Sequence, residues 1–82
     1  MTLRRSVRRY DLAVGQRQNF VTPEDLGRRV SFQFELPNGY VGEAVGTLED
    51  YDAAAQTYLV RNRKDELVRV PAIRVRFGRV VA

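Results

Sequence analysis

VSFQFELPNG, residues 30–39, is the stretch that decides the fold of this 82-residue chain. Its apolar residues alternate strictly with Ser31, Gln33 and Glu35, a period of two that is typical of a half-buried β-strand. Pro37 donates no amide hydrogen bond and Asn-Gly readily adopts positive φ. The segment therefore predicts a strand that ends in a hairpin turn at residues 37–39.

The segments after this turn predict four more short strands. Gly42 and Gly46 interrupt the second strand, and glycine inside a strand usually marks a bulge or a sharp bend. Five short, bent strands can close into a small barrel, which removes exposed sheet edges. The expected strands are 30–36, about 40–49, 57–61, 68–70 and 75–77. The expected core consists of Val30, Phe32, Phe34, Val45, Leu48, Tyr58, Val60, Val68, Val70 and Val75.

The segment before the first strand divides into two parts. Residues 22–25, Thr-Pro-Glu-Asp, predict a short helical turn, with a capping hydroxyl, a first-turn proline and two acidic groups at the positive end of the helix dipole. Gly27 ends it. Residues 1–21 are a basic extension, which forms either a short amphipathic helix or a flexible arm. The expected organisation is an N-terminal extension at 1–21 and a barrel at 22–82, an all-β class.

The composition excludes most catalytic chemistry. The sequence contains no Cys and no His, so it offers no thiolate or imidazole for a metal site, a nucleophile or a general base. We expect no catalytic residue, no cofactor, no metal and no enzymatic activity. No apolar run reaches the roughly 18 residues of a membrane span, and the Arg-rich start lacks the apolar core of a signal peptide. We therefore expect a soluble, cytoplasmic protein that does not bind membranes.

The positive charge is concentrated at the start of the chain. Residues 1–29 carry a net charge of +4, whereas residues 30–82 are neutral. Four arginines within six residues attract a phosphate backbone, and the release of counterions makes such binding favourable and salt-dependent. The neighbouring Tyr10 could stack on a base. The candidate polyanion-binding residues are Arg4, Arg5, Arg8, Arg9 and Tyr10, with Arg61, Arg63 and Arg69 extending the contact on the barrel.

Other interpretations of these residues remain open. The basic start could be a solvated segment or could contact an acidic protein. Arg61, Arg63 and Arg69 could form ordinary cross-strand ion pairs with nearby acidic residues such as Glu49 and Asp65. Four aromatic residues outside the expected core could either pack against the barrel or form a binding patch. These are Phe20, Tyr40, Tyr51 and Phe77.

Five short motifs carry a resemblance to a known family. They are Leu26-Gly27-Arg28-Arg29-Val30, Phe34-Glu35-Leu36-Pro37-Asn38-Gly39, Val45-Gly46-Thr47-Leu48, Tyr58-Leu59-Val60-Arg61 and Val68-Arg69-Val70-Pro71. The chain resembles the SH3-like barrel at the N-terminus of certain actinobacterial GNAT-type N-acetyltransferases. The resemblance spans about residues 26–78 and implies a small SH3-like barrel. These residues include no Gly-rich acetyl-CoA loop, so the resemblance implies no transferase activity and no site residue, and it leaves residues 1–21 aside.

Two functions follow from the sequence. The first is a non-catalytic binding module that uses its Arg-rich N-terminal segment to bind nucleic acid or another polyanion. The alternative is an SH3-like adaptor or accessory subunit that docks on a partner protein, such as an acetyltransferase. High salt should weaken the first kind of binding far more than the second.

Overall fold

A computed structural model of the protein describes residues 18–81, which form one curled sheet and two single 3-10 turns. None of the helical segments in this part of the chain is long or apolar enough to cross a membrane. The strands are β1 (Gln18–Asn19), β2 (Arg29–Glu35), β3 (Val41–Asp52), β4 (Thr57–Arg61), β5 (Leu67–Pro71) and β6 (Val75–Val80). The 3-10 turns are η1 (Pro23–Asp25), before β2, and η2 (Ala72–Arg74), between β5 and β6.

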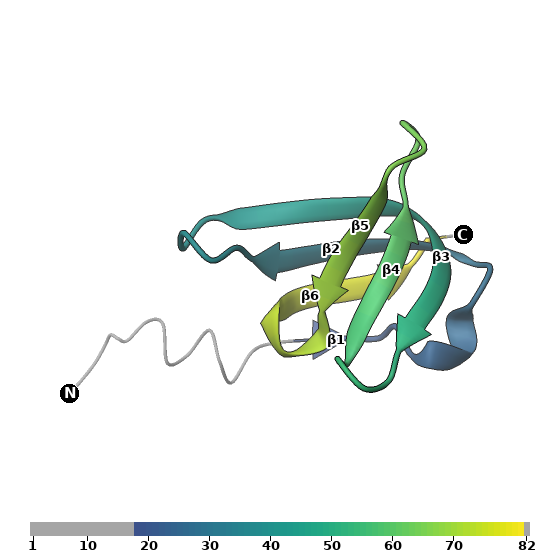
Figure 1. Ribbon diagram of the computed structural model, residues 1–82, viewed down its shortest axis with the longest axis horizontal. Coiled ribbons are helices and arrows are strands. Elements are labelled where there is room, and N and C mark those ends of the chain that lie inside the picture. Colours follow the sequence, from purple (N-terminus) through teal and green to yellow (C-terminus); the bar gives the residue numbers. More distant parts are fainter. Residues whose placement is uncertain (1–17, 82) are drawn as a thin grey trace.

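The sheet has the order β1-β6-β2-β3-β4-β5. Its long strand β3 pairs with two neighbours: residues 41–47 pair with β2 and residues 47–52 pair with β4. Figure 1 shows β3 curving from the hairpin with β2 round to β4. The strands β2 and β5, which are not neighbours in this order, also contact each other. The sheet therefore curls into a small barrel around one core, and the predicted all-β class is confirmed.

The turns that flank β2 form as the sequence predicts. Thr22 caps η1, its hydroxyl accepting from the Glu24 N–H at 3.2 Å, and the Asp25 carboxylate accepts from the Thr22 N–H at 2.9 Å. Gly27 ends this turn at φ 85°, a conformation that favours glycine. At the other end of β2, Gly39 adopts φ 90° and the Leu36 N–H donates to the Tyr40 carbonyl. This closed hairpin fixes the register of β2 against β3.

The core contains eight of the ten residues predicted for it. The prediction of Val45 as a core residue is wrong: its side chain is 37% exposed, and Ala44 is buried instead. The reason is the hairpin register, which sets Ala44 opposite the buried Phe32 and Val45 opposite Ser31 on the outer face. Val68 is only partly buried and packs against the core from its edge.

The N-terminal side of the sheet contains a strand that the sequence did not predict. β1 pairs in parallel with β6, with Gln18 level with Phe77 and Asn19 level with Gly78. Val21 follows and is buried in the core, where its carbonyl accepts a hydrogen bond from the Tyr58 hydroxyl at 3.0 Å. Residues 18–19 are thus a strand of the sheet and Val21 is part of its core, although the sequence assigned these residues to the extension at 1–21 rather than to the barrel at 22–82.

Candidate anion-binding pocket

Three strands bring Arg29, Thr47 and Arg61 into one row. Arg29 on β2 lies opposite Thr47 on β3, and Thr47 lies opposite Arg61 on β4. Residues directly opposite each other in antiparallel strands share a face of the sheet. The neighbours of this row along each strand, Val30, Leu48 and Val60, are buried in the core. The row therefore lies on the outer face.

A bulge in β3 produces this alignment. The pairing of β3 with β4 shifts by one residue between Leu48 and Asp50, so Glu49 is the extra residue. A bulge of this kind redirects the side chains that follow it. The register set by the turn after β3 would place Thr47 level with Asn62 if it continued unchanged. The shift instead keeps Leu48 beside Val60 in the core and sets Arg61 beside Thr47.

A pocket opens where β4 departs from β3. On one side is the edge of β3 at Val45 and Gly46, and on the other is the chain from Arg61 to Arg63. The two backbones approach closely, since a Cβ added to Gly46 would overlap the Arg61 carbonyl. Glycine at 46 is therefore what allows this approach. The pocket has a volume of about 440 Å³ and is lined by Arg29, Val45, Gly46, Thr47, Arg61, Asn62 and Arg63.

The turn that carries Arg63 is internally braced. The Asn62 side-chain carbonyl accepts from the N–H groups of Lys64 and Glu66, both at 2.9 Å. The Asn62 amide group donates to the Glu66 carboxylate at 3.1 Å, and Asp65 adopts φ 65° to complete the turn. Asparagine and aspartate suit such turns because their short side chains bond nearby backbone and tolerate positive φ. The backbone of Arg63 is therefore held in place before any ligand arrives.

The Arg61 guanidinium already has partners. It donates to both oxygens of the Glu49 carboxylate at 3.1 Å and to the Asp65 carbonyl at 3.0 Å. The hydrogen bonds from Arg61 lower the pKa of the Glu49 carboxyl below its ordinary value, and the same contact raises the pKa of Arg61. This bidentate pair fixes Arg61 at one wall of the pocket and neutralises much of its charge.

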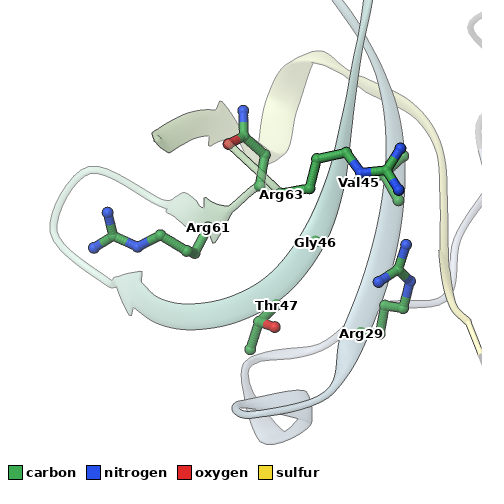
Figure 2. A pocket seen from close by; sticks show the side chains of 7 residues that line it. Arg29, Val45, Gly46, Thr47, Arg61 and Arg63 are labelled. Atoms are coloured by element: carbon green, nitrogen blue, oxygen red, sulfur yellow. The ribbon is translucent and has the colours of Figure 1, made fainter. Parts of the chain in front are cut away.

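Arg29 and Arg63 are in the opposite situation. Both are exposed, and among residues 18–81 no carboxylate forms an ion pair with either of them. Figure 2 shows the Arg63 side chain extended across Val45, with its guanidinium on the same side of the pocket as that of Arg29. The Arg61 side chain points the other way. Two guanidinium groups that share one side of a pocket repel each other, and a bound anion relieves that repulsion.

The pocket offers the donors that a phosphate, sulfate or carboxylate group needs. Arginine presents a planar fork of N–H donors that matches the oxygen pairs of these groups. The Thr47 hydroxyl, between the two arginine-bearing strands, is one further donor in the lining. No group of three or more metal-ligating side chains occurs in the part of the chain from 18 to 81. The donors of the lining are suited to an anion.

The structure separates the residues that the sequence grouped together. Arg4, Arg5, Arg8, Arg9 and Tyr10 lie outside the described residues. Arg61 and Arg63 meet at the pocket. Arg69 lies elsewhere, on β5 opposite Leu59 of β4, and its guanidinium is 3.9 Å from the Asp52 carboxylate, as expected of an ordinary ion pair. Arg29 was not predicted as a site residue, although its place before Val30 in the alternating strand puts it on the outer face.

Comparison with known proteins identifies the family. The model of the family described as "Rv0428c N-terminal Sm-like domain" matches residues 24–82, which is most of the chain and includes every residue of the pocket. No curated protein and no solved structure matches the chain. Rv0428c is a mycobacterial GNAT acetyltransferase, so the resemblance to the N-terminal domains of such enzymes is confirmed. The small barrel is of the kind called Sm-like, and the chain belongs to the family of Rv0428c N-terminal Sm-like domains.

Proposed function

We propose that this protein is a non-catalytic binding module that captures the phosphate groups of nucleic acid. The observation that carries this proposal is the pocket in which Arg29 and Arg63 lie on the same side without a carboxylate partner among the described residues. Arg4, Arg5, Arg8 and Arg9 would add further phosphate contacts, and Tyr10 a stacking surface. Nucleic acid is available in the cytoplasm, where we expect the domain to act.

The charge distribution supports a polyanion rather than a single small anion. Residues 1–29 carry the whole net charge of +4, and Arg29, the last arginine of that segment, lies in β2 of the barrel. A polyanion can bridge the pocket and the basic extension, so that several weak phosphate contacts act together. Each such contact releases counterions and adds to the salt dependence of binding.

Fluorescence anisotropy of labelled oligonucleotides tests the proposal. The titrations use the 82-residue chain at salt concentrations from about 50 to 300 mM, a range over which phosphate contacts weaken strongly. We expect Arg29→Ala combined with Arg63→Ala to weaken binding by about tenfold or more, because two charge-assisted contacts are lost. Arg69→Ala is the matched control, since this arginine is exposed, is on the same barrel and has Asp52 as its partner. Equal binding by the double variant and the native chain contradicts the proposal.

A second function is favoured by the family itself. A domain that belongs with the N-terminal domain of an acetyltransferase could serve as an adaptor that docks on a partner protein, including an acetyltransferase. The exposed apolar side chains Tyr40, Val41 and Ile73 would suit such a contact. Binding that persists at 300 mM salt and is insensitive to the loss of Arg29 and Arg63 would favour this adaptor over the phosphate-binding module.

A further inference from the structure

A pair of phenylalanines lies on the outer face of the sheet at its β1–β6 side, where Phe77 is opposite the exposed Gln33. Phe20 and Phe77 contact each other edge to face, with ring centroids 6.3 Å apart and an interplanar angle of 79°. Phe20 is 63% exposed, an unusual degree for so large an apolar side chain. Its ring therefore presents a free aromatic surface beside that of Phe77.

The backbone around Phe20 is anchored on both sides. The Asn19 side-chain carbonyl accepts from the Val21 N–H at 3.0 Å, and the Phe20 N–H donates to the Gly78 carbonyl at 2.8 Å. Val21 is buried, and the Tyr58 hydroxyl donates to its carbonyl. The exposed ring thus stands between two fixed residues, which lowers the entropy that its backbone would lose on binding a ligand.

The register of the sheet connects this aromatic pair to the pocket. Arg79, two residues after Phe77 and on the same face of β6, lies opposite Ser31 on β2, and Ser31 lies opposite Val45 on β3. Val45 lines the pocket and Arg63 extends across it. Because neighbouring strands lie about 4.8 Å apart, the backbone of Val45 is about 10 Å from the backbone of Arg79, two strands away. Arg79 is exposed and forms no ion pair with a carboxylate of residues 18–81.

The outer face therefore combines a stacking surface with the cationic side chains of Arg79 and of the pocket. Aromatic rings beside arginines suit single-stranded nucleic acid, because its bases are free to stack while its phosphates contact the cations. The bases of a duplex are already stacked on one another and cannot reach such a surface. We infer that this face binds single-stranded nucleic acid in preference to duplex, with a base stacked on Phe20 and with phosphates at Arg79 and the pocket. This inference rests on the proposed function.

The test separates base stacking from phosphate capture. Phe20→Ala should weaken the binding of a single-stranded oligonucleotide by about tenfold, as expected for the loss of one stacked base. The same substitution should leave the binding of inorganic polyphosphate unchanged, because that polyanion has no bases. Tyr40→Ala is the matched control, an aromatic that is 72% exposed at the tip of the β2–β3 hairpin. Thermal unfolding of each variant confirms that it is folded.

A tryptophan variant gives a direct signal. The chain has no Trp, so Phe20→Trp introduces a single fluorophore at the stacking position. Its fluorescence should be quenched by a single-stranded oligonucleotide and should be unaffected by an abasic strand of the same length or by polyphosphate. Equal affinity of Phe20→Ala and the native chain for single strands, or equal affinity of the native chain for base-bearing and abasic strands, overturns the stacking inference. Failure to bind polyphosphate or any oligonucleotide at low salt overturns the proposed function as well.

Discussion

At the scale of single residues, Gly46 controls the pocket by having no side chain. A Cβ at this position would overlap the backbone carbonyl of Arg61, and backbone cannot move aside as the end of a side chain can. Gly46→Ala should therefore destabilise the fold by about 1–3 kcal/mol, the usual cost of overpacking, and push the Arg61–Arg63 segment away from β3. Denaturant unfolding measures the cost.

Gly42 supplies the control for this prediction. A Cβ there would lie 3.1 Å from the end of the Leu36 side chain, which can shift. Gly42→Ala should consequently cost less than Gly46→Ala, although both glycines lie in the same strand. If the two variants unfold at the same denaturant concentration, the close approach of β3 and β4 at Gly46 does not matter for stability.

The Tyr58 hydroxyl links the segment that follows β1 to the core by one hydrogen bond. Its hydrogen bond to the Val21 carbonyl is buried, so Tyr58→Phe leaves that carbonyl without its partner. We expect a loss of about 1–2 kcal/mol in the free energy of unfolding at neutral pH. Urea unfolding of the native chain and of the Phe variant measures it.

The same residue makes the stability depend on alkaline pH. Burial raises the pKa of Tyr58 above its ordinary value of 10.0, so the folded state retains the proton where the unfolded state releases it. This contribution is complete below pH 10 and is lost as the pH rises through the folded-state pKa. The native chain should therefore lose stability above pH 10 more steeply than Tyr58→Phe. Parallel curves for the two proteins would contradict the assignment.

At the scale of elements, the β3 bulge supplies both the alignment of the pocket and a carboxylate that binds one of its arginines. Glu49 is the extra residue of the bulge and its carboxylate holds Arg61. Glu49→Gln keeps the length of the bulge but removes the charge that offsets the guanidinium. Anion affinity should rise by roughly two- to fivefold, the modest effect of one exposed charge. Anisotropy titrations measure it, and an unchanged or lower affinity would show that Glu49 does not oppose binding.

The bulge is also the feature of the site that the sequence could not predict. The alternation of residues 30–36 and the Asn-Gly turn predict β2, its outward positions and the hairpin, because each signal is local. The alignment of Arg29 with Arg61 depends instead on an extra residue at Glu49, which no local pattern reveals. β1 is equally hidden, since a two-residue strand has no periodicity and is held by distant partners such as Gly78 and Tyr58.

At the scale of the whole molecule, net charge and charge placement give different expectations. Residues 30–82 are neutral in sum, which predicts a barrel without electrostatic preference. The fold, however, pairs Arg61 and Arg69 with carboxylates and leaves Arg29, Arg63 and Arg79 without such partners among residues 18–81. Arg74 and Arg76 also lack such a partner there, but Arg29, Arg63 and Arg79 are the ones that share one outer face. The barrel therefore carries a basic surface although residues 30–82 are neutral in sum.

This arrangement predicts that the pocket and the N-terminal arginines contact one nucleic acid strand together. Each phosphate contact with a single strand contributes about 0.7 to the slope of log K against log salt concentration. Loss of Arg29 and Arg63 should lower the slope by about 1.4, and loss of Arg4, Arg5, Arg8 and Arg9 by up to about 2.8. A chain lacking all six should show both reductions, since the two groups are separate contacts to the same ligand. If the pocket substitutions leave the slope unchanged while the N-terminal arginines are present, the basic segment binds alone and the barrel face has another role.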